Sequence, residues 1–212
     1  MLPLRTDAHW LFIGDSITDC GRREDEDGLG GGYVRIIRDW LLARSPADAP
    51  AVLNRGIGGN TIRDLDARWQ ADVIDEKPDV VSVKIGINDV WRQLDGKAPG
   101  VPLEEFVATY DRLISRTIEA LPGVKIVLCE PSVISPPQPA KGNEMVLPYA
   151  MSIRELATKH REHVAFHVPL HGVCKEAEAQ RPDVVWWPDG VHPTSAGHAL
   201  LARTWLSEAG LL

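Results

Sequence analysis

The chain has 212 residues, of which 44% are hydrophobic, and its formal net charge is −7 at pH 7. This length is sufficient for one sizeable hydrophobic core, so we expect a single domain over residues 1–212. A chain with this excess of acidic residues lacks the basic surface to which nucleic acids and anionic membranes bind, so we expect neither as a partner.

Five short apolar runs have the length and composition of strands that are buried on both faces of a sheet. Each run is rich in β-branched or other apolar residues and stands between segments of different periodicity. The runs are Trp10–Ile13, Ala51–Leu53, Val80–Ile85, Val124–Cys129 and Val164–Val168.

Helical spacing of apolar residues occurs between and after these runs. One apolar stripe covers Leu103–Leu121, and a second covers Ile62–Val73. Thr61 and Asp64 have the spacing of a capping-box pair at the start of the second stripe. We expect the last helix over Thr194–Ala209.

Alternating strands and helices predict right-handed β-α-β crossovers and a parallel sheet covered on both faces. We therefore expect an α/β fold, a three-layer α/β/α sandwich of the flavodoxin-like kind with five strands in the order 2-1-3-4-5. The proline-rich segment Pro131–Pro148 follows the fourth strand and is predicted to be a long surface loop. It would lie at the carboxyl edge of the sheet, where ligand sites of open α/β sheets are found.

Four polar clusters occupy positions that the fold would bring to this edge. In the strand order 2-1-3-4-5, the clusters after the first three strands lie next to one another. They are Gly-Asp-Ser at 14–16, Gly-Gly-Asn-Thr at 58–61, Gly-Ile-Asn-Asp at 86–89 and Asp-Gly-Val-His at 189–192.

These clusters contain the groups that acyl transfer through a serine requires. Such a reaction needs a base for the hydroxyl proton, a group that orients the base, and preorganised donors for the oxyanion. A serine, an imidazole with a carboxylate three residues away, an asparagine amide and a glycine-rich backbone segment are all candidates.

Phosphate binding is the competing interpretation of the glycine-rich segments. The segment at 54–61 opens a predicted helix, whose N–H groups suit an anion, but it has no Gly-Lys-Ser/Thr ending. The glycines of 28–32 follow acidic residues that would repel phosphate, which favours a flexible loop. The alternative from a different class is therefore a non-catalytic, phosphate-binding flavodoxin-like module.

The four clusters resemble the four blocks of the SGNH hydrolases, also called GDSL esterases, which are named after serine, glycine, asparagine and histidine. The matching residues are Ser16, Gly59, Asn88 and His192. The resemblance implies that Ser16 is the nucleophile, that His192 is the general base and that Asp189 orients the histidine. It also implies an oxyanion hole formed by the N–H groups of Ser16 and Gly59 and the side-chain amide of Asn88, with no cofactor and no metal.

Longer stretches are similar to the intracellular acetyl-xylooligosaccharide esterases of this family. They cover Leu11–Arg22, Asn54–Ile74, Ile85–Gln93 and Asp189–Ala202. This similarity implies deacetylation of acetylated sugars, chiefly xylo-oligosaccharides, by a homo-oligomer. The match is weaker between about residues 95 and 185, where the substrate walls would be built. A small-acyl arylesterase, lysophospholipase or thioesterase with the same site residues is therefore the alternative.

Five residues beside the clusters are candidates for substrate binding. Trp91, Trp186 and Trp187 flank the asparagine and aspartate clusters, and an indole face suits the apolar face of a sugar ring. Arg55 and Arg92 could bond substrate hydroxyls. Packing is an equally good interpretation for the tryptophans, and surface ion pairing for the arginines.

The remaining metal-binding and redox-active residue types indicate no further site. The histidines between 160 and 171 are interrupted by a predicted strand and by Pro169, so we expect no metal centre there. The three cysteines are widely spaced and odd in number, which fits a reducing, cytoplasmic location. The N-terminal segment shows no signal-peptide pattern, and we expect a soluble protein that is not exported.

Overall fold

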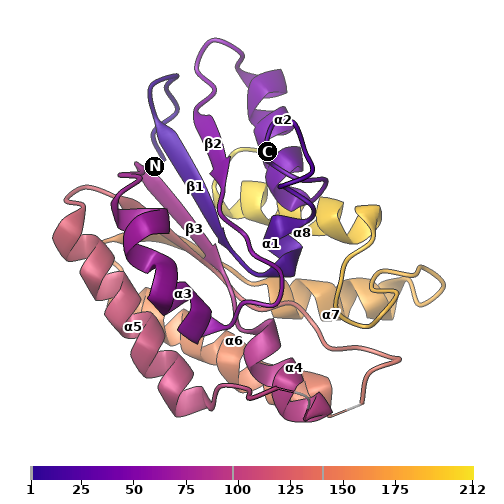
Figure 1. Cartoon of the computed structure of the whole chain (residues 1–212). Helices are drawn as coiled ribbons and strands as arrows, with labels where there is room; N and C mark the ends of the chain where they lie inside the picture. Colours follow the sequence, from indigo (N-terminus) through magenta and orange to yellow (C-terminus); the bar gives the residue numbers. More distant parts are fainter. Residues whose placement is uncertain (1, 97, 140) are drawn as a thin grey trace.

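A five-stranded sheet forms the centre of the fold (Figure 1). The computed structural model describes residues 2–96, 98–139 and 141–212. The strands are all parallel and follow the order β2-β1-β3-β4-β5. They are β1 (His9–Gly14), β2 (Ala51–Asn54), β3 (Val80–Lys84), β4 (Lys125–Cys129) and β5 (Val164–Val168).

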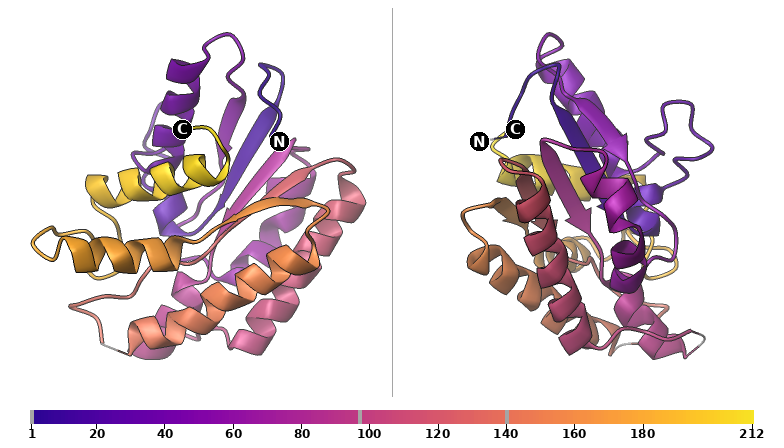
Figure 2. Two further views of the ribbon diagram at one scale, coloured as in Figure 1. Left: turned by 180° about the vertical axis from the view of Figure 1, so that it is seen from behind. Right: turned by 60° about the vertical axis from the view of Figure 1, so that its left-hand side comes forward.

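Helices cover both faces of this sheet (Figure 1 and Figure 2). Helices α3 (Ile62–Trp69), α5 (Leu103–Ala120) and α6 (Gly142–Lys159) pack along one face. Helices α2 (Tyr33–Arg44) and α8 (Ser195–Glu208) pack together on the other, as right-handed crossovers require. The predicted three-layer α/β/α sandwich and its strand order are thus confirmed. The helical segments are α1 (Ser16–Asp19), α2 (Tyr33–Arg44), α3 (Ile62–Trp69), η1 (Gln70–Ile74, a π-helical turn), α4 (Ile87–Asp95), α5 (Leu103–Ala120), α6 (Gly142–Lys159), α7 (Leu170–Gln180) and α8 (Ser195–Glu208).

Apolar side chains of both helical layers meet the sheet. Every residue of β3 is buried, as expected for a central strand that is covered on both faces. Helix α5 buries Phe106, Tyr110 and Leu113 along one stripe. Helix α8 buries Trp205, whose indole N–H donates to the hydroxyl of Ser82 on β3. Among the described residues no helix has the length and apolar character needed to cross a membrane.

Three strands end at the same level, which brings the polar clusters together. Gly14 of β1 lies beside Lys84 of β3, and Lys84 lies beside Cys129 of β4. On the other side of β1, Phe12 pairs with Asn54, the last residue of β2. The segments that follow β1, β2 and β3 therefore leave the sheet side by side at its carboxyl edge.

Helix ends follow the predicted capping pattern. At the start of α3 the Asp64 carboxylate accepts the backbone N–H of Thr61 at 2.8 Å, and both halves of the capping box are present. Helix α8 is capped by the side chain of Thr194, which was predicted as the start of the last helix. Both predictions are confirmed.

The prediction of a long surface loop over Pro131–Pro148 is only partly correct. Residues 131–135 are irregular but buried, because Val133 and Ile134 pack in the core, and the second part of the segment is helical. Residues 136–139 are also irregular and position 140 lies outside the described residues, but α6 begins at Gly142 and contains Pro148. A proline inside a helix costs about 3 kcal/mol because it removes a hydrogen bond and crowds the preceding turn. Burial of Tyr149 and Ile153 on the same helix, worth roughly 1.5–3 kcal/mol each, offsets this cost.

Candidate active site

The turn after β1 brings Ser16 to the edge of the sheet. Gly14 passes so close to β3 that a Cβ atom there would lie 2.2 Å from the carbonyl oxygen of Lys84, so only glycine fits. The Asp15 carboxylate then caps the short helix α1 by accepting the N–H of Ile17 at 3.0 Å. Burial raises the pKa of Asp15, against the opposing effect of the Lys84 ammonium. Ser16 is the first residue of α1, where backbone N–H groups have no partner within the helix.

Ser16, His192 and Asp189 form a continuous chain of hydrogen bonds. The Ser16 hydroxyl oxygen lies 2.8 Å from His192 Nε2, and His192 Nδ1 lies 2.6 Å from Asp189 Oδ2. The other carboxylate oxygen of Asp189 accepts the backbone N–H groups of Val191 and His192 at 3.0 and 2.7 Å. An ionised carboxylate can only accept, so Nδ1 carries a proton and the neutral ring leaves Nε2 free to accept one from the serine hydroxyl.

The protonation state of Asp189 suits this arrangement. Partial burial favours the neutral acid, but the hydrogen bonds from the His192 ring and from the N–H groups of His192 and Val191 outweigh it and lower the pKa of Asp189. The side chains of Asp189 and His192 are 47% and 41% exposed, so a substrate can reach the pair from solvent.

Gly59 and Asn88 lie on two neighbouring loops of the same edge. Gly59 has φ +79°, a conformation that favours glycine, and its carbonyl oxygen accepts a hydrogen bond from the Arg92 guanidinium. Asn88 is in the first turn of α4, and its side-chain amide donates to the carbonyl of Asn60 at 3.0 Å. An amide nitrogen carries two protons, so the second can be donated to another oxygen.

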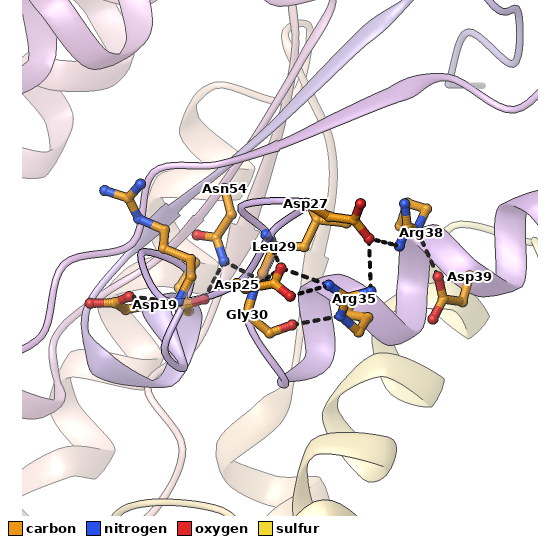
Figure 3. Close-up of polar contacts among 11 residues, drawn as sticks. Asp19, Asp25, Asp27, Leu29, Gly30, Arg35, Arg38, Asp39 and Asn54 are labelled. Carbon is orange, nitrogen blue, oxygen red and sulfur yellow. Dashed lines mark hydrogen bonds and ion pairs between the residues drawn. The ribbon is translucent and has the colours of Figure 1, made fainter.

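Asn54 connects the segment that leads to Gly59 with two neighbouring segments by hydrogen bonds. Its side-chain nitrogen donates to the carbonyls of Thr18 and Leu29 at 2.6 and 2.8 Å (Figure 3). Its side-chain oxygen accepts the N–H of Gly56 at 2.8 Å. Asn54 is 1% exposed. This one side chain therefore ties the end of β2 to the segment that follows Ser16.

Asp19 makes a second connection between these segments. Its carboxylate accepts the N–H of Gly58 at 3.0 Å, while Arg22 donates to the carbonyl of Gly56 at 2.6 Å. The backbones of the two segments touch, because a Cβ atom on Gly56 would lie 2.2 Å from the nitrogen of Asp19. Sequence reasoning assigned no role to Asn54 or Asp19. Asn54 ends β2 and Asp19 ends α1, and the local sequence does not indicate their partners in the other segments, which are 25 to 39 residues away.

The glycine-rich segment at 28–32, predicted to be a flexible loop, is held by Asp25. The Asp25 carboxylate accepts the N–H groups of Leu29 and Gly30 at 2.8 and 3.1 Å and pairs with Arg35 at 2.6 Å (Figure 3). The hydrogen bond from Leu29 and the pairing with Arg35 lower the pKa of Asp25. The carbonyl of Leu29 also accepts a hydrogen bond from Asn54, so this loop is connected to the segment that leads to Gly59.

Asp89 connects the third cluster to the second. Its buried carboxylate accepts the N–H of Ile62, the first residue of α3, at 3.0 Å. Burial raises the pKa of Asp89 to about 7, and the nearby carboxylates of Asp15 and Asp64 act in the same direction.

The five residues predicted as candidates for substrate contact have different surroundings. Trp91 lies beside His192, with ring centroids 6.0 Å apart in an edge-on arrangement. Arg92 contacts the Gly59 loop. Arg55 instead pairs with Glu76, as an ion-pairing arginine would.

The two adjacent tryptophans also differ. Trp187 is 5% exposed and packs in the core, and Trp186 donates its indole N–H to the carbonyl of Arg181. The structure thus brings Trp91 beside His192 and Arg92 to the Gly59 loop. The side chains of Arg55, Trp186 and Trp187 instead contact Glu76, Arg181 and the core.

Comparison with known proteins agrees with this geometry. A model of the GDSL-like Lipase/Acylhydrolase family matches residues 12–200. The chain belongs to this family, also called the SGNH hydrolases, and is a carboxylic ester hydrolase homologous to acetylxylan esterases. An acetylxylan esterase from Geobacillus stearothermophilus is 41% identical over 209 residues, covering 94% of this chain and 93% of that protein.

Solved structures show the same similarity over the full length. The crystal structure of Axe2, an acetylxylan esterase from Geobacillus stearothermophilus, has a TM-score of 0.85 and 38% identity, covering 99% of this chain and 97% of that one. Three Axe2 variants described as catalytic mutants have a serine, a histidine or an aspartate replaced by alanine. LAE5, an alpha/beta hydrolase from the metagenome of Lake Arreo in Spain, has a TM-score of 0.87 and 33% identity, covering 100% and 99% of the two chains.

Proposed function

We propose that this esterase removes acetyl groups from acetylated sugars, xylo-oligosaccharides in particular, through an acetyl-serine intermediate. Ser16 is the nucleophile, His192 the general base and Asp189 the residue that orients the histidine. The observation that carries the proposal is the pair of short contacts, 2.8 Å from Ser16 to His192 and 2.6 Å from His192 to Asp189. These contacts have the order and atoms that an activated serine requires.

The reaction begins with attack of the Ser16 oxygen on the ester carbonyl while His192 Nε2 takes the hydroxyl proton. The tetrahedral intermediate collapses as the bond to the sugar oxygen breaks, and His192 returns the proton to that oxygen. Water then attacks the acetyl-serine, again giving a proton to His192, and acetate leaves as Ser16 regains its proton. Asp189 stabilises the imidazolium that forms in each half of the cycle. No step calls for a metal or an organic cofactor.

The oxyanion of each tetrahedral intermediate is bound by three donors in this proposal. These are the backbone N–H groups of Ser16 and Gly59 and the side-chain amide of Asn88. Preorganised donors stabilise the charge without having to reorient during the reaction, and this is a large contribution in serine hydrolases. The contacts of Asn54 and Asp19 support the role of Gly59, because they fix its loop against the segment that carries Ser16.

The sugar substrate is supported by similarity and by one aromatic side chain. The full-length relatives with 37–41% identity are described as acetylxylan or acetyl-xylooligosaccharide esterases. Trp91 lies beside His192 and offers an indole to the substrate region, as a sugar-binding site would.

We further propose that residues 1–212 form one domain, which acts in the cytoplasm as a homo-oligomer. A single cluster of buried apolar residues unites both helical layers in the described part of the chain, which supports one domain. Cys20, Cys129 and Cys174 are free thiols, which fits a reducing compartment. Light scattering coupled to size-exclusion chromatography tests the oligomer, and the elution of one species with the mass of a single chain would contradict it.

Acetate release from a panel of acetylated xylo-oligosaccharides tests the substrate directly, with Ser16→Ala as the inactive control. A parallel series of 4-nitrophenyl esters tests the acyl length, and we expect activity to fall sharply beyond acetyl or propionyl. Preference for long acyl chains, or hydrolysis of 4-nitrophenyl acetate without acetate release from any sugar, would favour an arylesterase, lysophospholipase or thioesterase instead.

A further inference from the structure

The side-chain amide of Gln138 joins two segments of the candidate active site. Its Nε2 donates to the backbone carbonyl of Asp189 at 2.9 Å, and its Oε1 accepts the indole N–H of Trp91 at 3.2 Å. Gln138 lies in the irregular segment after β4, Trp91 lies on α4, and Asp189 precedes α8. One side chain therefore connects three parts of the chain that are distant in sequence.

The backbone around Gln138 is fixed against the same loop. The Gln138 N–H donates to the carbonyl of Ser135 at 3.0 Å, and the Ser135 N–H donates to the carbonyl of Gly190 at 2.8 Å. Gly190 has φ +86°, and a Cβ atom there would lie 2.1 Å from the Ser135 oxygen and 2.8 Å from Gln138 Cγ. The two segments are thus in direct contact, and Gln138 cannot shift without moving the loop that carries Asp189 and His192.

Trp91, which is hydrogen-bonded to Gln138, also lies beside the ring of His192. The rings of Trp91 and His192 are 6.0 Å apart and inclined by 65°. Asn88 precedes Trp91 by three residues on α4, so the oxyanion amide and the indole share one face of the helix. In the proposed mechanism, an acyl group on Ser16 whose carbonyl oxygen is bound by Asn88 lies on this side of the helix, and its carbon chain extends toward Trp91.

Glutamine is suited to this position by its hydrogen-bonding capacity. An amide side chain offers a donor and an acceptor at once, whereas an ionised glutamate is only an acceptor. Glutamate could still accept from Trp91 but would turn a carboxylate oxygen toward the carbonyl of Asp189. Leucine, of similar size, could make neither bond.

We propose, on the basis of the acetyl-serine mechanism above, that Gln138 is a positioning and specificity-determining residue. It holds Asp189 and His192 in line with Ser16, and through Trp91 it limits the length of the acyl group. It does not touch the reacting atoms. Sequence reasoning missed it, because it lies in the proline-rich segment and its partners are 47 and 51 residues away.

The test compares Gln138→Leu, Gln138→Glu, Trp91→Phe and the double variant Gln138→Leu/Trp91→Phe. The matched control is Gln180→Leu, which removes an exposed glutamine that bonds Glu176 on α7. Steady-state kinetics with 4-nitrophenyl acetate and butyrate are measured over a range of pH, and thermal unfolding is measured for each variant. Gln180→Leu keeps the wild-type kcat, pH profile and acyl preference.

We expect Gln138→Leu to lower kcat for the acetate ester by roughly tenfold, because a misaligned base costs turnover more than binding. The ratio of butyrate to acetate activity rises at the same time. The double variant is no slower than Gln138→Leu alone within about twofold, because the bond lost in Trp91→Phe is already absent. In Gln138→Glu the acid limb of the pH–rate profile moves to higher pH, because a new carboxylate beside the pair stabilises the imidazolium.

Multiplicative effects in the double variant would overturn the proposal, as would loss of thermal stability with unchanged acyl preference and pH profile. These outcomes are distinct from failure of the proposed function. A Ser16→Ala variant that is as active as wild type would overturn the acetyl-serine mechanism itself, whatever the kinetics of the Gln138 variants.

Discussion

The hydroxyl oxygen of Ser16 lies 2.8 Å from Nε2 of His192, although the two residues are 176 positions apart in the chain. The parallel sheet makes this contact possible. Ser16 follows β1 at the carboxyl edge, and the loop before α8 returns to the same edge from the far end of the chain. The chemistry proposed for this chain depends on that meeting.

Replacing Asp189 by asparagine will test the orientation of His192. The change preserves size, but an amide can donate to Nδ1 and so favour the wrong tautomer of the ring, which in serine hydrolases lowers kcat by about 10⁴-fold. Turnover of 4-nitrophenyl acetate measures the effect. Asp183→Asn is the matched control, because Asp183 is an exposed aspartate paired with Arg181, and it keeps wild-type turnover. An Asp189→Asn enzyme within tenfold of wild type would be incompatible with this role.

Removing the amide of Asn88 will test the oxyanion hole. In Asn88→Ala we expect kcat to fall by about 10²–10³-fold with little change in KM, since the donor acts on charge that develops in the transition state. Thermal unfolding of the variant serves as the control, because Asn88 also bonds the carbonyl of Asn60. A rise in KM at constant kcat would show that the amide binds substrate and not the oxyanion.

Substitution of Asn54 will show how strongly its hydrogen bonds stabilise the loop that contains Gly59. Asn54→Ala leaves the buried carbonyls of Thr18 and Leu29 without this donor, and each such loss costs roughly 1–3 kcal/mol. We expect the free energy of unfolding in urea to fall by about 2–5 kcal/mol. Asn54→Asp keeps the acceptor for Gly56 and loses the donor, so it also destabilises the fold. Two variants as stable as wild type would contradict this account.

Because Asp89 is buried, we expect the free energy of unfolding to depend on pH. Its pKa is raised to about 7 in the folded protein by burial, whereas an unfolded aspartate titrates near 3.9. Between these values the folded chain keeps a proton that the unfolded chain releases. The free energy of unfolding therefore falls as pH rises from about 4 to 7, by on the order of 4 kcal/mol from this group, and levels off above that window.

Asp89→Asn is the matching variant, because its side-chain oxygen can still accept the N–H of Ile62. Urea unfolding of both proteins at a series of pH values measures the difference. We expect the stability of wild type relative to Asp89→Asn to decline across the window. Parallel curves for the two proteins would refute the assignment of this titration to Asp89.

Local sequence patterns predicted most of the fold. Apolar runs located all five strands to within about two residues, because buried strands of a parallel sheet are short and continuously apolar. The same reasoning failed at Pro148, where local propensity opposes the helix and burial of Tyr149 and Ile153 decides the outcome. Tertiary packing of that kind has no signature in the segment itself.

The candidate site likewise contains some residues that sequence motifs predicted and others that they did not. The clusters that contain Ser16, Asn88 and His192 were predicted from motifs, and the structure brings their side chains to one edge, while their roles stay predictions. The supporting residues Asn54 and Gln138 could not be predicted, because their partners are distant in sequence. Nor could spacing decide that Arg55 pairs with Glu76.

The most direct test of the account is mass spectrometry of the enzyme after reaction with a 4-nitrophenyl phosphonate ester, which forms a stable bond with an activated serine. We predict one phosphonyl group per chain, on the peptide that contains Ser16, and no labelling of the His192→Ala variant under the same conditions. An active wild-type enzyme that stays unlabelled, or that carries the label on another residue, would contradict the claim that Ser16 is the nucleophile.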